Sequence, residues 1–171
     1  MIDELSKAAS RRITTLPKSL QELLLKGRND PVIFIQELLG MPLHPGQIRY
    51  LKETTSSEVK IGVLVPSNRW GKSSLIACKQ IWKLFYKHGI RTGNRDAWAK
   101  AEYRTANIAP HSALVEPVFK YIDQIMTSKF PINLPDGRVV TNKCLIEWFY
   151  NEEKTTHSAP YKQYFSNNSY I

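Results

Sequence analysis

Cysteine is scarce in this sequence, and long apolar runs are missing. The 171 residues include only two cysteines, Cys78 and Cys144, whose spacing matches no metal or redox motif. No apolar run approaches the about 18–20 residues that a membrane-spanning helix needs, so we expect no membrane partner. The first residues lack the basic-then-apolar pattern of a signal peptide. We therefore expect a protein of a reducing cytoplasm, with Cys78 as a small core residue.

Acidic residues are also few, since 15 Asp and Glu stand against 24 Lys and Arg and give a net charge of +9. Such an excess indicates either a polyanionic partner or a solvated basic surface. Lys79, Lys83 and Lys87 recur every four residues, which places them on one face of an expected helix. The basic segment 89–96 that follows is the better candidate for contact with nucleic acid. Both features also fit an ordinary solvated surface.

The most informative pattern that is present is a phosphate-loop pattern. Residues 61–65 are an apolar run typical of a buried strand, and an apolar-periodic helix is expected from Lys72 onward. Between them, Gly71-Lys72-Ser73 matches the residues with which phosphate loops open a helix. Loop N–H groups and the positive end of the helix would face phosphates, the Lys would add a point charge, and the Ser hydroxyl would bind Mg²⁺. The pattern predicts ATP and Mg²⁺ as cofactors; the alternative is a chance Gly-Lys-Ser at a helix start.

The loop departs from the usual pattern at its first position, where Pro66 replaces Gly. Pro has no N–H, so it can shape the turn but cannot donate to a phosphate. Arg69 adds a second cation whose planar fork suits phosphate oxygens. Trp70 is expected to support the loop by packing rather than to contact ATP directly. The expected nucleotide-binding residues of the loop are Ser67, Asn68, Arg69, Trp70, Gly71, Lys72, Ser73 and Ser74.

The order of the expected elements predicts an α/β fold of the P-loop NTPase type. Asp30 and Pro31 begin a helix, as an N-cap followed by Pro at the first helical position. Strand 61–65, the phosphate-loop helix, a second buried strand at 103–109 and a strongly periodic helix after Ser112 then alternate. This alternation indicates a parallel sheet flanked by helices on both faces, an αβα arrangement.

The tail changes character. Residues 134–137 are expected to form a turn, and residues 144–150 are strand-like. Residues 162–165 are expected to form one strand of a terminal β-hairpin whose return strand begins at 170–171. Because a return strand of two residues is too short for a finished fold, we expect the domain to be incomplete at its C-terminus.

An acidic partner for the phosphate loop is not evident. Phosphate-loop ATPases also use an apolar strand that ends in Asp, commonly followed by Glu. The only candidate follows the strand-like segment, where Asn151 would replace the Asp and Glu152 would be the catalytic base. Asn is a poor substitute for a carboxylate that orders a metal ion. We therefore favour the alternative that this segment is a strand running into a polar loop.

These motifs, in this order, resemble the ATPase domain of the large terminase subunits of tailed phages, the motors that pump DNA into procapsids. The similarity covers about residues 30–171. In that family the Asp-Glu strand lies beyond the point where this chain ends, and Asn168 stands where the family's hairpin usually has Gly. The matching segments are Asp30-Pro31-x-x-Phe34, Leu43-x-Pro45-x-Gln47, Asn68-Arg69-Trp70-Gly71-Lys72-Ser73 and residues 163–171.

The resemblance implies a role for individual residues. Gln47 would hydrogen-bond the adenine edge, Lys72 would bind the β and γ phosphates, and Ser73 would bind Mg²⁺. Arg69 matches the family's loop Arg, which is thought to sense or stabilise the γ-phosphate, so Lys72 and Arg69 are the expected catalytic residues. The family's catalytic Glu, coupling motif and nuclease domain are absent. This chain alone is therefore expected to bind nucleotide weakly and to hydrolyse little or none.

The resemblance also implies partners and a location. These are double-stranded DNA, a small terminase subunit, the portal of the procapsid and, in the full-length protein, further copies in a ring, all in the host cytoplasm. Residues 1–29 would be an arm or docking helix, and residues 30–171 a partial ATPase domain. Two other hypotheses stay open: a helicase-like phosphate-loop translocase, and a non-hydrolysing DNA-binding module on a degenerate nucleotide fold, which would bind DNA but ignore ATP.

Overall fold

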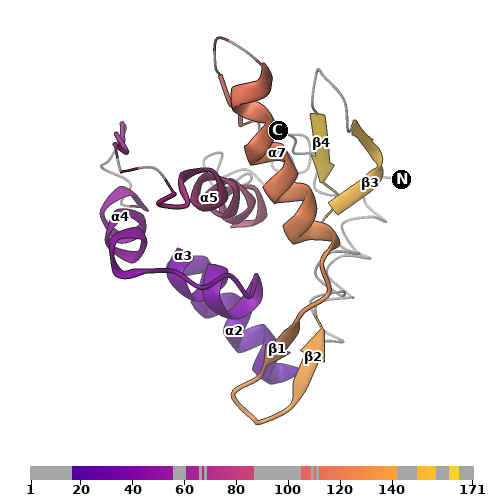
Figure 1. Ribbon diagram of the computed structural model, residues 1–171. Coiled ribbons are helices and arrows are strands. Elements are labelled where there is room, and N and C mark those ends of the chain that lie inside the picture. Colours follow the sequence, from indigo (N-terminus) through magenta and orange to yellow (C-terminus); the bar gives the residue numbers. More distant parts are fainter. Residues whose placement is uncertain are drawn as a thin grey trace, which may run out of the picture.

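Helices dominate the fold in a computed structural model of the chain (Figure 1). The structure describes residues 17–55, 61–65, 67, 69–86, 105–108, 110, 112–141, 150–156 and 162–165. The helical elements are α2 (Lys18–Asn29), α3 (Pro31–Ile33), the π-helical turn η1 (Phe34–Leu38), α4 (Pro45–Thr55), α5 (Lys72–Tyr86) and α7 (Ser112–Thr127). The strands are β1 (Pro131–Asn133), β2 (Val139–Thr141), β3 (Tyr150–Thr156) and β4 (Lys162–Phe165).

The parallel sheet predicted from the sequence is absent from the described residues, so the prediction of a P-loop-type αβα fold is wrong. The strands form two separate antiparallel pairs instead, β1 with β2 and β3 with β4. In the first pair Ile132 lies opposite Val140. In the second, Tyr150 lies opposite Phe165, and the register shifts between Asn151 and Thr156. What remains is a mostly helical arrangement with two short hairpin-like sheets.

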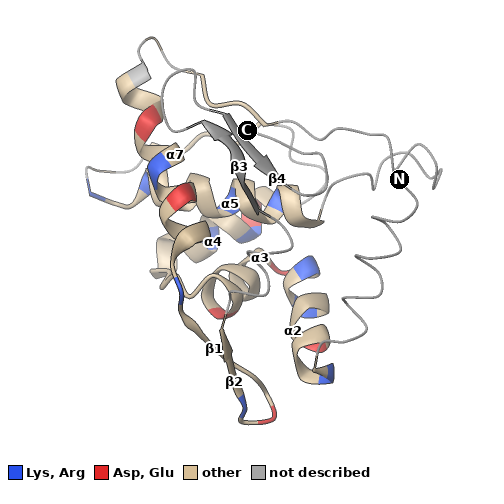
Figure 2. Cartoon of the chain, turned by 90° about the vertical axis from the view of Figure 1, so that its right-hand side faces the viewer, with Lys and Arg blue, Asp and Glu red and all other residues tan. Residues whose placement is uncertain are grey.

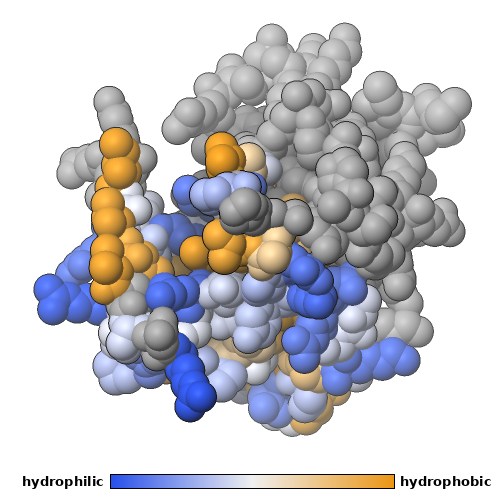
Figure 3. Space-filling view, turned by 45° about the horizontal axis from the view of Figure 1, so that its top comes forward, coloured by the Kyte–Doolittle hydropathy of each residue, from blue (hydrophilic) through white to orange (hydrophobic). Residues whose placement is uncertain are grey.

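Residues 61–65, predicted as a buried strand, have no regular secondary structure. Ile61, Val63 and Val65 are 84%, 78% and 87% exposed, and Figure 3 shows such apolar side chains standing out from the surface. The described part of the second predicted strand, 105–108, is also irregular, and Ile108 is 93% exposed. A β-branched run favours extended backbone, but a strand forms only against a partner. Neither segment has a paired strand among the described residues.

The helix predicted to begin at Asp30 is confirmed. Asp30 caps it, because its Oδ1 accepts a hydrogen bond of 2.8 Å from the backbone N–H of Val32, and Pro31 occupies the first helical position. The helix then widens into η1, where the Leu39 N–H donates to the Phe34 carbonyl at 3.0 Å, five residues back. Gly40 follows directly with a positive φ of 63°, a conformation common just after the end of a helix.

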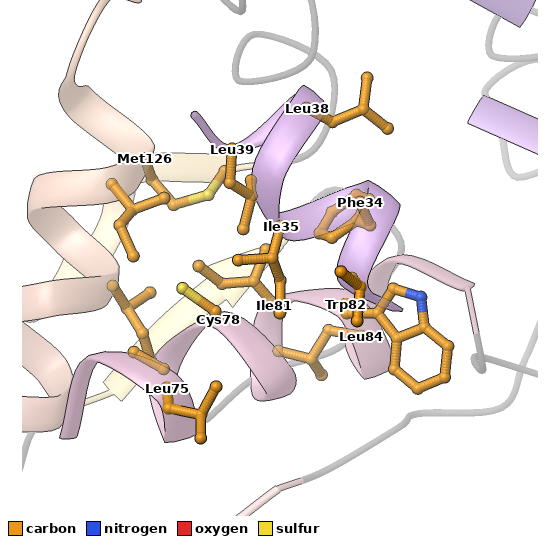
Figure 4. Packing of buried hydrophobic residues seen from close by; sticks show 14 of the residues in the cluster. Phe34, Ile35, Leu38, Leu39, Leu75, Cys78, Ile81, Trp82, Leu84 and Met126 are labelled. Carbon is orange, nitrogen blue, oxygen red and sulfur yellow. The ribbon is translucent and has the colours of Figure 1, made fainter. Parts of the chain in front are cut away.

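The hydrophobic core lies between η1, α5 and α7, with α2 packed against it. In Figure 4, Ile35 of η1 and Cys78 and Ile81 of α5 point toward one another. Burial raises the pKa of the Cys78 thiol to about 12, in keeping with its expected place in the core. Trp82 is 1% exposed, and its Nε1–H donates to the Gly27 carbonyl of α2 at 2.8 Å. That bond ties α5 to α2, in the segment expected as an arm.

The turn predicted at 134–137 is confirmed as the connection of β1 and β2. The Gly137 N–H donates to the Leu134 carbonyl at 2.9 Å, and Gly137 has a φ of 81°. Asp136 in the same turn accepts from Ser19 Oγ of α2 and from Arg138 Nη2, both at 2.6 Å. The Arg138 guanidinium and the Ser19 hydroxyl hold the pKa of that carboxyl well below its usual range. The hairpin is thereby fastened to α2.

The tail forms the strand predicted at 162–165, which is β4, and it pairs with β3. The hairpin predicted between this strand and 170–171 stays a prediction. Residues 166–171 lie outside the described residues. Asn151 and Glu152 lie within strand β3 and not in the polar loop that we expected after a strand at 144–150. Residues 144–149 lie outside the described residues. The backbone hydrogen bonds of β3 thus come from a partner that the sequence pattern did not indicate.

Candidate nucleotide-binding site

The candidate site is the loop that connects residues 61–65 to α5. Ser67 and Arg69 are exposed, whereas the positions from Trp70 to Ser74 are half-buried. Asn68, which is part of the predicted site, and Pro66, which precedes it in the loop, lie outside the described residues. Figure 2 marks the Lys and Arg positions along the chain, including those on α5. Among the described site residues, Lys72 and Arg69 bring two cations to the first turn of α5.

Two left-handed residues bend the loop sharply. Arg69 has a φ of 64° and Gly71 a φ of 80°. The left-handed region suits Gly but costs other residues about 1–2 kcal/mol. Arg69 therefore holds a conformation that the surrounding structure must stabilise, a kind of strain that often marks functional loops. The bend brings the chain directly into α5 at Lys72.

Gly71 is the residue directly before α5. Its carbonyl accepts a hydrogen bond from the Leu75 N–H at 3.0 Å and another from Ser74 Oγ at 2.9 Å. The first N–H groups of a helix have no carbonyl partner within it, and the helix dipole adds positive charge there. The hydroxyl of Ser74 is thus engaged in the helix start. The hydroxyl of Ser73, one residue earlier, is the one that could bind a metal ion.

Gln47 is brought into direct contact with the loop. Only 7% of Gln47 is exposed, and its Nε2 donates to the Trp70 carbonyl at 3.0 Å. Its Oε1 accepts from the His44 N–H at 3.1 Å, so the side-chain amide bridges the start of α4 and the loop. One amide N–H and one oxygen lone pair of Gln47 remain for another partner. The adenine contact implied for Gln47 would have to use these.

His44 also lies at the site, although no sequence pattern indicated it. Its ring meets the Trp70 ring edge-on, with centroids 4.7 Å apart. The Gly46 N–H donates to His44 Nδ1 at 3.1 Å and fixes the ring orientation. His44 occupies the unspecified position of the Leu43-x-Pro45-x-Gln47 motif, so the motif marked the segment but not this residue. Trp70 packs against His44 and the edge of the core, as expected of a loop support.

The described residues of the site do not form a metal site built from protein ligands alone. Within the part of the chain that the structure describes, no group of three or more His, Cys, Asp or Glu side chains could hold a metal ion. Mg²⁺ commonly keeps several waters and binds through one or two protein ligands together with substrate phosphates. Ser73, on the first turn of α5, fits that kind of ligand. An Mg²⁺ ion here would arrive with the phosphates of a nucleotide.

Replacement of Gly71 by alanine is expected to weaken the binding of a fluorescent ATP analogue by about tenfold. An added Cβ would lie 2.8 Å from Gln47 Nε2, and the φ of 80° is unfavourable for Ala. Either the loop or the Gln47 bridge must then shift. Fluorescence titration of folded wild type and variant measures the effect.

Gly137→Ala is the matched control for that variant. Gly137 has nearly the same φ, 81°, but nothing lies within 4 Å of an added Cβ. It should cost about 1–2 kcal/mol of stability and leave nucleotide affinity unchanged. Equal affinities for Gly71→Ala and wild type would contradict the role of the loop conformation.

Comparison with models of protein families, with curated proteins and with solved structures finds no match to this chain. Among the described residues, no helix has the length and apolarity needed to span a membrane. The functional interpretation therefore depends on the loop's own geometry and on the motif pattern.

Proposed function

We propose that this chain binds ATP with Mg²⁺ through the loop at 67–74 and the start of α5. The observation that carries the proposal is the hydrogen bond of 3.0 Å from buried Gln47 Nε2 to the Trp70 carbonyl. It fixes the loop at Trp70, two residues before the first residue of α5. A pre-formed loop at a helix N-terminus, followed by Lys72, has the chemistry that phosphates require.

Each side chain has a defined part in the proposed binding. The N–H groups of the first turn of α5 donate to phosphate oxygens, and Lys72 adds a point charge at the outer phosphates. Ser73 supplies a hydroxyl ligand to Mg²⁺. Arg69, exposed at the rim of the loop, can close over the terminal phosphate and neutralise charge that develops there during transfer. These roles make Lys72 and Arg69 the proposed catalytic residues of an Mg²⁺-dependent ATPase.

The larger function proposed is that of the ATP-binding part of a terminase large subunit, which packages double-stranded DNA. The motif order of Asp30-Pro31, the upstream Gln47 and the Arg-Trp-Gly-Lys-Ser loop supports it, together with the net charge of +9. The small terminase subunit, the portal of the procapsid and further copies of the chain are the proposed partners. ATP turnover that rises on addition of DNA and procapsids would support packaging.

Titration of ATP and GTP analogues against wild type, Gln47→Ala and Gln47→Glu tests the nucleotide proposal. Gln47→Glu keeps the shape but faces the Trp70 carbonyl with an acceptor, so we expect both analogues to bind about tenfold more weakly. If Gln47 also contacts adenine, ATP affinity should fall more than GTP affinity.

Gln36→Glu, an exposed position on η1, makes the same chemical change away from the loop and should bind like wild type. A folded wild-type protein that binds neither analogue would overturn the proposal. If that same protein bound DNA, the hypothesis of a nucleotide-independent DNA-binding module would be favoured.

A further inference from the structure

A pocket separate from the phosphate loop lies between α4, α5 and the segment 105–108. Its volume is about 250 Å³, below the about 300–1,000 Å³ of pockets that take drug-sized ligands. A site of this size suits a small ion rather than a nucleotide. The pocket is lined by Tyr50, Ile76, Lys79, Gln80, Lys83 and Thr105.

The ammonium of Lys79 is held in place at this pocket. Its Nζ donates to Thr54 Oγ1 at 2.5 Å and to the Thr54 carbonyl at 3.4 Å, and lies 4.9 Å from the centroid of the Tyr50 ring. Burial and the neighbouring charge of Lys83 lower the pKa of Lys79 to about 8. An anion between the two lysines would offset both effects.

No carboxylate of the described residues neutralises these two cations. The ion pairs formed there join Arg49 with Glu53, Lys120 with Glu116 and Arg138 with Asp136. Among the described residues, Lys79 and Lys83 therefore line one half-buried pocket without a carboxylate as counter-charge. Two like charges side by side in a partly desolvated site are costly unless an anion joins them.

A third donor points to the same kind of ligand. The Thr105 hydroxyl is buried and has no hydrogen-bond partner in the structure, although Thr105 lines the pocket. Its segment is fastened to α5 by two reciprocal amide hydrogen bonds between Gln80 and Asn107, of 3.1 and 3.2 Å. A buried hydroxyl without a partner is unusual and calls for an acceptor. The lining of the pocket thus includes three side chains that can donate hydrogen bonds, those of Lys79, Lys83 and Thr105.

We propose that this pocket binds a small oxyanion, namely inorganic phosphate. The three residues lie at two positions one turn apart on α5 and on the segment 105–108, and all three line the same space. Lys79 follows Lys72 by seven residues, about 10 Å along the helix and on the same face. The pocket is therefore a second anion site, close to the phosphate loop but distinct from it. This inference stands whether or not the loop binds ATP.

Isothermal titration calorimetry with sodium phosphate tests this assignment. Chloride is the balancing anion that keeps the ionic strength constant. Lys79→Met retains most of the apolar stem and should weaken phosphate binding by about tenfold. Thr105→Val keeps the side-chain shape, removes the unpaired hydroxyl and should weaken binding severalfold. Lys52→Met removes one exposed cation of α4 and should stay within about twofold of wild type. Circular dichroism checks that each variant is folded. If Lys79→Met does not fold, Thr105→Val alone tests the phosphate site.

Lys72→Ala separates this pocket from the phosphate loop. The phosphate affinity of the pocket should survive that substitution even where nucleotide binding is lost. The assignment is overturned if folded wild type binds no phosphate, or if Lys52→Met weakens binding as much as Lys79→Met. It is equally overturned if phosphate binding disappears in Lys72→Ala but persists in Lys79→Met and Thr105→Val, since the ion then binds at the loop.

Discussion

Lys72→Ala should weaken binding of a fluorescent ATP analogue by about 100-fold. An ammonium and a phosphate charge about 4 Å apart attract each other by about 4 kcal/mol at an effective dielectric constant of 20. Part of this is offset by desolvation, and a net loss of about 3 kcal/mol corresponds to about two factors of ten in affinity. Lys72 is the first residue of α5 and only half-buried, so the fold should tolerate its truncation.

Titration with and without Mg²⁺ measures this effect. Lys52→Ala, on the exposed face of α4, removes the same charge away from the loop and should change affinity less than about twofold. Lys72→Arg retains the positive charge but not the compact ammonium, and should fall between Ala and wild type. If Lys72→Ala bound the analogue as tightly as wild type, the Gly-Lys-Ser sequence would be a chance occurrence at a helix start.

Trp82→Ala should lower the free energy of unfolding by about 3–5 kcal/mol, the usual cost of truncating a large buried aromatic side chain. Trp82 is 1% exposed and packs between α5 and the rest of the core. Its truncation would also leave the Gly27 carbonyl of α2 without the hydrogen bond of 2.8 Å. Domains of this size are stable by only about 5–15 kcal/mol in total, so much of the stability would be lost.

Urea unfolding followed by circular dichroism measures this loss. Trp82→Phe should cost less, because a ring remains and the main deficit is the unpaired buried carbonyl, about 1–3 kcal/mol. Trp70→Ala is a useful comparison, since Trp70 is half-buried in the loop and should affect nucleotide affinity more than stability. Trp82→Ala as stable as wild type would contradict the packing of α5 against α2.

The helices could be predicted from sequence because their signals are local. Asp30 and Pro31 mark a helix start through a cap that spans two residues, and the apolar period of α5 and α7 lies within each helix. The turn at 134–137 is equally local, since Gly137 supplies the positive φ that it needs. Each of these features depends on residues fewer than about five positions apart.

The sheets could not be predicted, because strand pairing is decided by residues far apart in the chain. The β-branched run at 61–65 has the composition of a strand, yet composition does not supply a partner. The residue range of β4 was predicted correctly. Its pairing with β3 and the register shift after Asn151 could not be, because they depend on backbone contacts that no periodicity of the sequence encodes. The alternation of strands and helices therefore suggested a sheet order that the described residues do not have.

The candidate site could be predicted in part, better than the sheets but less completely than the helices. The loop was predicted from its residue pattern and Gln47 from the family resemblance, but the hydrogen bond that joins them spans 23 residues and became visible only in three dimensions. His44 carried no signal, because a single His at an unspecified motif position has many uses. The Lys79 pocket was seen only as a repeat of lysines, since the unpaired Thr105 hydroxyl comes from a distant segment.

The exposed apolar residues at 61–65 have a consequence for the behaviour of the protein in solution. This irregular segment makes no backbone hydrogen bond with the described residues, so its N–H and C=O groups can pair with another molecule and promote aggregation. The net charge of +9 keeps molecules apart at low ionic strength, but at about 0.15 M salt charges are screened beyond about 8 Å. Solubility should therefore fall as salt is added. Purely electrostatic binding to DNA would weaken over the same range of salt concentration.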